Sequence, residues 1–177
     1  MTDNQLMTLL IATISAGLAA QSLSVPILQE YQPTTQGTPS TDTVYIFKLS
    51  ETRYGFPGRK NIFADSVMTH SETERMEVTY QINALAIQNP ANTTQTTAAD
   101  YVRAVGRALQ SDAAIQALLA EGVGIYRIQA MRQPYFKDDE GQFEATPSFD
   151  FTVAYNDVIS SIVPSTDATT ETVTGFS

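Results

Sequence analysis

The sequence predicts an α+β domain with a mostly antiparallel sheet and helices packed on one face. Alternating apolar and polar residues indicate half-buried strands within residues 74–87 and 149–155. Apolar residues recur at helical spacing within residues 3–20 and 97–120. The predicted order along the chain is helix, strands, two helices, strands, which favours an α+β arrangement of the two layers.

Residues 3–20 are the first predicted helix. Asp3 is the expected N-terminal cap, and Gly17 weakens the other end. We expect the apolar stripe of this helix to pack on the core; a membrane-binding or partner-binding helix is the alternative. The stripe consists of Leu6, Leu9, Leu10, Thr13, Ile14 and Gly17.

Residues 24–31 contain Pro26 and predict a short edge strand, where proline is tolerated. Residues 32–42 are rich in Pro, Thr and Gly and predict a loop. Residues 43–49 are apolar on both faces, which predicts a central strand that is covered on both sides.

Residues 50–71 are the least regular part of the interior of the chain. Within them, a Gly- and Pro-containing stretch at residues 53–60 predicts a flexible loop that contacts an acidic partner or a phosphate. A merely exposed loop is the alternative. The candidate contact residues of this loop are Arg53, Tyr54, Phe56, Arg59 and Lys60.

His70 is the only histidine, and it lies in a polar run. A catalytic histidine needs a nearby nucleophile and an orienting acid, and no such set is evident in the sequence. We therefore expect His70 to be dispensable. The long strand that follows, residues 74–87, ends at Asn89-Pro90.

Residues 97–111 predict the second helix, and Thr97 with Asp100 resembles a capping box. Arg103 and Arg107 are four residues apart and lie outside its apolar stripe. They mark either a solvated face or a set of salt bridges between subunits.

Asp112 is the expected cap of a third, shorter helix, and Gly122 is its expected C-terminal cap. Residues 123–132 predict another strand. No internal repeat is evident.

An acidic turn then separates a short aromatic run from the alternating strand at 149–155. Its basic and aromatic residues, Tyr135, Phe136 and Lys137, are candidate interface residues. Its acidic residues, Asp138, Asp139 and Glu140, lack the ligand spacing of a calcium loop, so we interpret them as a solvated turn.

Composition limits the possible functions. The net charge of -9 argues against ordinary nucleic-acid binding, but it is compatible with a channel wall that DNA passes without sticking. The chain has no cysteine, which excludes disulfides and Cys-based metal sites. The first apolar stretch is short for a membrane span, so we expect no membrane association.

The length suits one domain, which we place at residues 1–160, followed by a polar, flexible tail at 161–177. Nucleotide-binding, zinc-protease and serine-hydrolase signatures are absent from the sequence. We therefore expect no catalysis, no metal and no cofactor. The alternatives are a small hydrolase that uses His70, or a soluble ligand-binding or adhesion module.

Three groups of residues resemble the neck or tail terminator (gateway) proteins of contractile-tailed bacteriophages. The first is the N-terminal helix followed by Val25-Pro26-Ile27 and Tyr45-Ile46-Phe47. The second is the long strand followed by the helix that begins at residues 97–102 and by Gly124–Arg127. The third is Met131–Phe136, the acidic turn and the strand at Phe149–Tyr155.

The resemblance covers about residues 3–160 and implies a terminator-like fold without catalytic residues. It implies a homo-oligomeric ring, with six subunits expected, at the neck of a virion made in the host cytoplasm. Its implied partners are the portal-side connector and the tail tube and sheath proteins. Genomic DNA would pass through a channel without specific binding, and we expect Asp138, Asp139 and Glu140 to line that channel.

Overall fold

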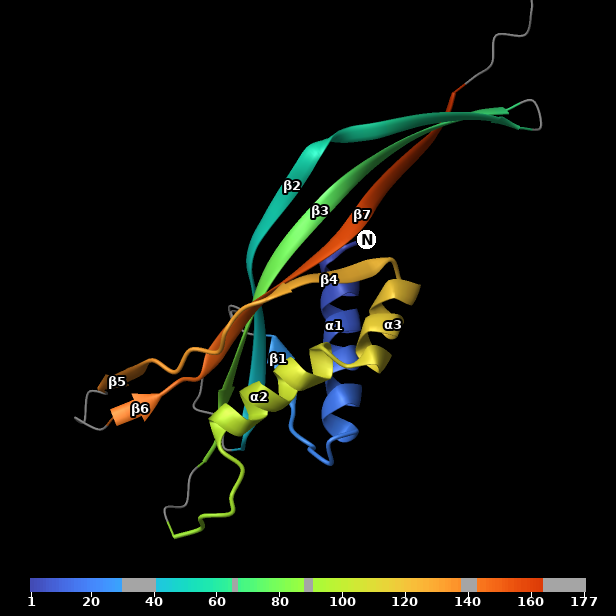
Figure 1. Cartoon of the computed structure of the whole chain (residues 1–177). Coiled ribbons are helices and arrows are strands. Elements are labelled where there is room, and N and C mark those ends of the chain that lie inside the picture. Colours follow the sequence, from blue (N-terminus) through green and yellow to red (C-terminus); the bar gives the residue numbers. More distant parts are fainter. Residues whose placement is uncertain (30–40, 65–66, 88–90, 138–142, 164–177) are drawn as a thin grey trace, which may run out of the picture.

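The computed structural model describes residues 1–29, 41–64, 67–87, 91–137 and 143–163. Over these residues the chain forms three helices, a five-stranded sheet and a separate two-stranded hairpin. Figure 1 shows the helices packed against one end of the sheet, while three of its strands continue well beyond them. The fold thus has a helix-covered body and a long strand extension.

The sheet has the strand order β1-β2-β3-β7-β4. β1 lies parallel to β2, and the other neighbours are antiparallel, so the predicted α+β class with a mostly antiparallel sheet is confirmed. β1 is a sheet edge, as the proline-containing segment predicted. The strands are β1 (Ile27–Gln29), β2 (Thr43–Ala64), β3 (Val67–Leu85), β4 (Val123–Ile128) and β7 (Ser148–Val163).

The core lies between the sheet and the helices α1 (Asp3–Ala19), α2 (Ala98–Leu109) and α3 (Asp112–Ala120). Alternate residues of β3 and β7 point into it, because successive side chains of a strand point to opposite faces. Tyr80 and Phe151 face each other across these two strands and stack with ring centroids 5.6 Å apart. The alternation predicted for Phe149, Phe151, Val153 and Tyr155 is confirmed, since all four are buried.

Two helix starts differ from the sequence-based expectation by one residue. Thr2 caps α1 by accepting from the backbone N–H of Gln5, whose side chain accepts from the backbone N–H of Thr2 at 2.8 Å. Asp3 is therefore the first helical residue rather than the cap. Ser111, not Asp112, caps α3. Both predicted caps stand beside a hydroxyl that reaches the backbone N–H groups more directly.

The predicted cap of α2 is confirmed. The Thr97 hydroxyl accepts from the backbone N–H of Asp100, and the Asp100 carboxylate accepts from the backbone N–H of Thr97 at 3.1 Å. The hydrogen bonds from Thr97, above all the side-chain one, hold the pKa of Asp100 below its usual value. Gly122 follows α3 with a φ of 74°, the left-handed conformation that favours glycine at a helix end.

Gly17 allows α1 to pack closely against α2, which the sequence did not predict. A Cβ atom at this residue would lie 2.4 Å from the Cβ of Ala108 in α2. The two helices can approach this closely only because Gly17 has no side chain. The expected weakening of the helix end is thus accompanied by close packing of α1 against α2.

The expectation for residues 43–49 is correct for position and wrong for burial. Val44 and Ile46 are buried under the helices, but Phe47 on the other face is half-buried, and Leu49, at a register shift, is exposed. Helices cover only one face of this sheet, so a strand that is apolar on both faces need not be covered on both.

Asp150 is buried on the sheet face that the helices leave open. Its Oδ1 accepts from Arg132 Nη2 at 2.6 Å and from Gln81 Nε2 at 2.7 Å. A buried carboxylate needs such partners to offset its loss of hydration. Asp150 lies on the sheet face opposite Phe149 and Phe151, and it is nevertheless only 7% exposed.

We predict that Gly17→Ala destabilises the protein. The new methyl group would meet the Cβ and Cα atoms of Ala108, neither of which can rotate away. Overpacking costs about 1–3 kcal/mol, and we expect the upper end here, which exceeds the helix-propensity gain of about 1 kcal/mol.

Gly106→Ala is the matched control, since its nearest neighbour, Phe149, is an ordinary 3.9 Å away. That substitution should stabilise the helix by about 0.5–1 kcal/mol. Chemical denaturation measures both variants, and a Gly17→Ala protein as stable as the wild type would refute the close-packing argument.

A second prediction concerns Asp100 and acid. Because its folded pKa is depressed, its stabilising effect is present above the unfolded pKa and is lost as pH falls through the folded pKa. Asp100→Asn should therefore be less stable than the wild type near neutral pH and less sensitive to acid.

Urea denaturation at about pH 6 and about pH 3 spans the ordinary range of carboxyl titration. The difference in unfolding free energy between the wild type and Asp100→Asn should shrink at the lower pH. Asp112→Asn, in the first turn of α3, is the control. Equal acid sensitivity of the wild type and Asp100→Asn would contradict the prediction.

Candidate interaction surface

Three strands extend beyond the helix-covered body, and we call this extension the arm. It consists of residues 51–64 of β2, 67–75 of β3 and 156–163 of β7. In Figure 1 it rises away from the helices and ends where β2 turns into β3. From Glu51 to Ala64 every residue of β2 is exposed except the half-buried Pro57. The arm is thus a sheet without a core.

The prediction that residues 53–60 form a flexible loop is wrong. These residues belong to β2 and pair with β3, with a register shift between Tyr54 and Gly58. Gly55 takes a φ of 83° at this irregularity, a conformation that glycine adopts readily. The Gly and Pro residues that suggested a loop therefore mark a bulge in a long strand.

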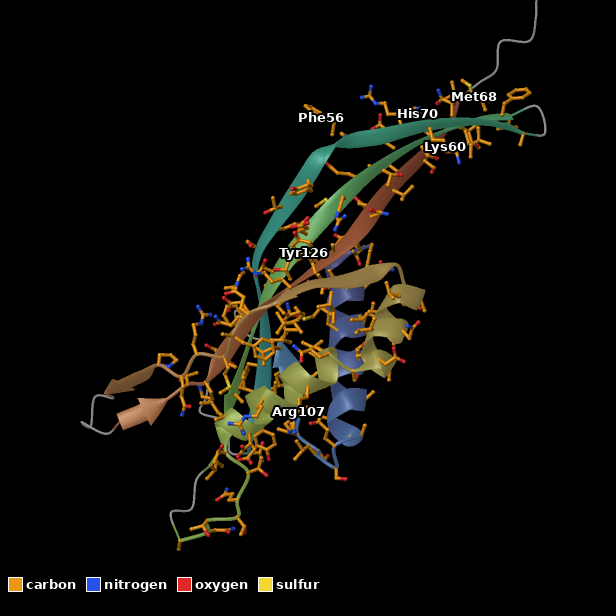
Figure 2. The ribbon with its side chains drawn as sticks, viewed as in Figure 1. Phe56, Lys60, Met68, His70, Arg107 and Tyr126 are labelled. Carbon is orange, nitrogen blue, oxygen red and sulfur yellow. The ribbon has the colours of Figure 1, made fainter. Side chains whose placement is uncertain are left out.

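The bulge places Phe56 in solvent. Its side chain is 99% exposed, and Figure 2 shows it projecting from the bend of β2. Tyr54, on the other side of Gly55, is also largely exposed. Two aromatic side chains displayed at one bend fit the predicted role in contacts, because exposed aromatics are enriched in interface hot spots.

The helix-side face of the arm, which continues the core face of the body, carries a ladder of ion pairs. Arg53 lies 3.5 Å from Glu74, and Arg59 Nε lies 3.0 Å from Glu72 Oε1. Both arginine side chains remain more than 70% exposed, so a neighbouring molecule can still reach them. Exposed pairs of this kind contribute little stability, about 0–1 kcal/mol each.

His70 lies in this ladder. Its Nδ1 lies 2.6 Å from Asn61 Oδ1, and its Nε2 lies 3.3 Å from Glu72 Oε1. The hydrogen bond from His70, together with the nearby charge of Arg59, lowers the pKa of Glu72. The contacts of His70 thus link neighbouring strands of the arm.

The open face of the arm is the face that points away from the helix layer. By register it carries Lys60, Ile62, Val158 and Ile162, all of which are exposed. Nearer the body, the Arg75 guanidinium lies 6.0 Å from the centroid of the Tyr126 ring, within range of a cation–π contact. Figure 2 shows Lys60 on the arm and Tyr126 near its base.

Arg103 and Arg107 lie on the exposed side of α2, away from the arm. Arg103 binds Asp100 of its own helix at 2.8 Å, so it supports the cap. Arg107 is exposed in the last turn, where its charge is favourable for the helix dipole. The sequence left open whether these arginines face solvent or another subunit, and both choices remain compatible with these positions.

Tyr135, Phe136 and Lys137 form β5 (Tyr135–Lys137), which pairs with β6 (Phe143–Ala145). Figure 1 places this small hairpin at the end of the molecule opposite the arm. The predicted interface residues therefore lie in three separate places: on the arm, on α2 and in this hairpin. Asp138, Asp139 and Glu140 lie outside the described residues.

A hollow of about 370 Å³ lies between α2, α3 and the edge strand β4, away from the predicted residues. Its lining is mainly apolar, and Leu119 at its rim is exposed. The sequence showed the apolar residues of α3, but not that the helix leaves this space beside β4. The lining residues are Leu109, Gln110, Ile115, Leu119, Gly124, Ile125 and Ile128.

Two further observations describe the chemistry of the surface. Over the described residues, no group of three or more His, Asp or Glu side chains is placed to hold a metal ion. None of the helices within the same residues is long and apolar enough to cross a membrane.

Comparison with known proteins gives two kinds of similarity, one in fold and one in sequence, and they differ in weight. The similarity in fold is to a solved structure, the sheath/tube terminator of the extracellular contractile injection system PVC in its extended state. The two share 15% sequence identity and a TM-score of 0.57, over 100% of this chain and 66% of that chain. At this identity the likeness shows the fold alone. No curated protein matches the sequence.

The second similarity is between the amino-acid sequence and a protein-family model. The family model of the E217 gateway protein gp29 matches residues 5–165, which include α1 from Gln5 onward, the other two helices and the entire five-stranded sheet. Because this match spans nearly the whole chain, the resemblance drawn from the sequence is confirmed, and the chain belongs to the family of the E217 gateway protein gp29.

Proposed function

We propose that this chain is a structural virion protein that terminates the tail of a contractile phage and joins it to the head-side connector. The observation that carries the proposal is the gateway-family match over residues 5–165. The fold likeness to a sheath/tube terminator supports the same role. The proposal places the chain at the neck of the virion, after synthesis in the host cytoplasm.

The protein acts in this role as a homo-oligomeric ring, with six subunits as the expected number. A ring needs two different surfaces on each subunit, because a head-to-tail contact must repeat until it closes. The arm and the β5–β6 hairpin are two such surfaces at opposite ends of the molecule. We assign subunit contacts to Arg53, Tyr54, Phe56, Arg59, Lys60, Arg103 and Arg107, and to Tyr135, Phe136 and Lys137.

Genomic DNA passes through the ring without specific binding. The net charge of -9 supports this, because an acidic wall repels the phosphate backbone at short range. We assign Asp138, Asp139 and Glu140 to the wall of the channel. The tail tube and sheath proteins lie on one side of the ring, and the connector or portal-side protein lies on the other.

A nonsense mutation in the gene for this chain tests the proposed role. We expect heads without attached tails, and free tails of abnormal length, when infected cells are examined by electron microscopy. Wild-type protein supplied in trans should restore joined particles and should be present in them by immunoblot. Joined particles of normal tail length from the nonsense mutant would overturn the proposal.

The role is structural rather than catalytic, and His70 provides the test. We predict that His70→Ala supports normal assembly, because the hydrogen bonds of His70 join it to polar side chains of the arm, Asn61 and Glu72, and Arg59 still pairs with Glu72. The unfolding free energy should change by about 0.5 kcal/mol or less, as for most surface substitutions.

Plaque titres after complementation with His70→Ala measure this directly, with the wild-type gene as the reference. A loss of titre from a variant that folds and enters particles normally would refute a purely structural role.

A further inference from the structure

Both outer strands of the arm have open edges. On its side away from β3, β7 pairs with β4 only from Phe151 to Tyr155, so residues 156–163 have no strand neighbour there among the described residues. From outside the sheet, the N-terminal ammonium of Met1 donates to Asp157 Oδ1 of this segment at 3.3 Å. On its side away from β3, β2 pairs with β1 only at residues 44–46, which leaves the β2 edge of the arm open as well. Open edges present unpaired backbone N–H and C=O groups.

The edge of β7 lacks the devices that usually protect an exposed strand. Residues 156–163 contain no Lys and no Pro, and their register against β3 has no bulge. Ile159 and Ile162 are nevertheless 68% and 75% exposed. A long, regular, apolar edge of this kind pairs readily with another strand, so its exposure points to coverage in the assembled state.

We propose that β7 of one arm pairs with β2 of the arm of a second copy, so that the arms of the ring form one continuous sheet. This inference rests on the proposed function, because it assumes that copies of the chain surround a common axis. The pairing segments are residues 156–163 and residues 58–64, which lie at matching heights on the two sides of β3.

Charge supports pairing between unlike edges. Residues 58–64 include Arg59 and Lys60 and no acid, whereas residues 156–163 include Asp157 and no base. Two β2 edges would place like charges side by side, and so would two β7 edges. The unlike pairing brings Asp157 near Arg59 of the neighbour on the helix-side face.

Apolar residues also match on each face. On the helix-side face, Phe63 and Val163 lie at the same height, both level with Met68; on the open face, Ile62 and Ile162 do so, both level with Thr69. Phe63, Ile62 and Ile162 are exposed in the isolated chain. Cross-strand contacts of this kind stabilise a sheet by about 0.2–1 kcal/mol per pair.

Topology fixes the direction of the pairing. β2 and β7 are each antiparallel to β3, so they run in the same direction through the arm. Rotation about an axis along the arms preserves that direction, and the strands at each junction must therefore be parallel. In a closed ring, each subunit would contribute three arm strands to the continuous sheet.

Cysteine cross-linking tests the pairing, because the chain has no cysteine of its own. We would combine Ile62→Cys with Val158→Cys, Ser160→Cys or Ile162→Cys, all on the open face, to allow for the unknown stagger. Within one chain β3 separates these positions by about 9.5 Å, which is beyond the reach of a disulfide.

Particles assembled in infected cells would be oxidised and run on non-reducing gels. At least one combination should give a ladder of covalent oligomers that collapses on reduction. Phe63→Cys with the same three partners is the matched control, since Phe63 lies on the opposite face and should give no ladder. Absence of a ladder from all three open-face combinations overturns the pairing.

Single-cysteine variants distinguish the competing contacts. Dimers from Ser160→Cys alone would indicate β7–β7 pairing and would overturn the proposal. Covalent attachment of Ser160→Cys to a different virion protein would overturn it as well. Chain present in particles without any ladder would refute the arm pairing and leave the proposed function intact, whereas chain absent from particles would refute the proposed function.

A double substitution, Ile159→Lys with Ile162→Lys, provides a second measurement. Both side chains are exposed, so the chain should fold and melt like the wild type, but plaque titre should be lost. Leu119→Lys adds a charge at an exposed apolar residue of α3 and is the control. An unchanged titre from the double variant would contradict the inference.

Discussion

The fold depends on the pairing of β3 with both of its neighbours. β3 pairs with β2 from Val67 to Leu85 and with β7 from Met68 to Asn83, so it lies between them in the body and in the arm. The arm has no core, since the helices cover only the other end of the sheet. Backbone hydrogen bonds to β3, and the side-chain pairs across it, therefore hold the arm together.

The two ends of the sheet are stabilised in different ways. In the body, residues such as Tyr80 and Phe151 are buried, and apolar burial provides most of the stability. In the arm, hydrated ion pairs and exposed side chains dominate, and their individual contributions are small. The exposed side chains of the arm therefore contribute little to the stability of a single chain, and they remain available for contact with a partner.

The sequence was most informative where one face of an element is buried. Burial imposes the alternation seen at Phe149–Tyr155, and the unpaired backbone N–H groups of a helix start favour the capping box at Thr97; both were predicted correctly. Residues 51–64 are exposed on both faces, so no alternation marks them as a strand. Gly55 and Pro57 then favoured a loop, although β3 holds them in a bulge.

The candidate interaction surface could also be predicted only in part, because its residues are exposed. The sequence identified Arg53, Phe56 and Lys60 as contact residues from their types, but their arrangement on a long strand came from the pairing with β3. It also gave no sign of the hollow beside β4, because that space depends on how α3 meets the sheet. β7 extends to Val163, beyond the boundary expected at residue 160.

The continuity of β3 from body to arm also makes the arm a lever. From Glu77 to Val67 the strand spans about 33 Å, at about 3.3 Å per residue. A rotation of the body by about 6° would thus move the far end of the arm by about 3.5 Å at right angles to its strands, which is most of the roughly 4.8 Å between neighbouring strands of a sheet. The angular accuracy with which the body is seated therefore determines whether the arm tip lies within hydrogen-bonding distance of its proposed neighbour.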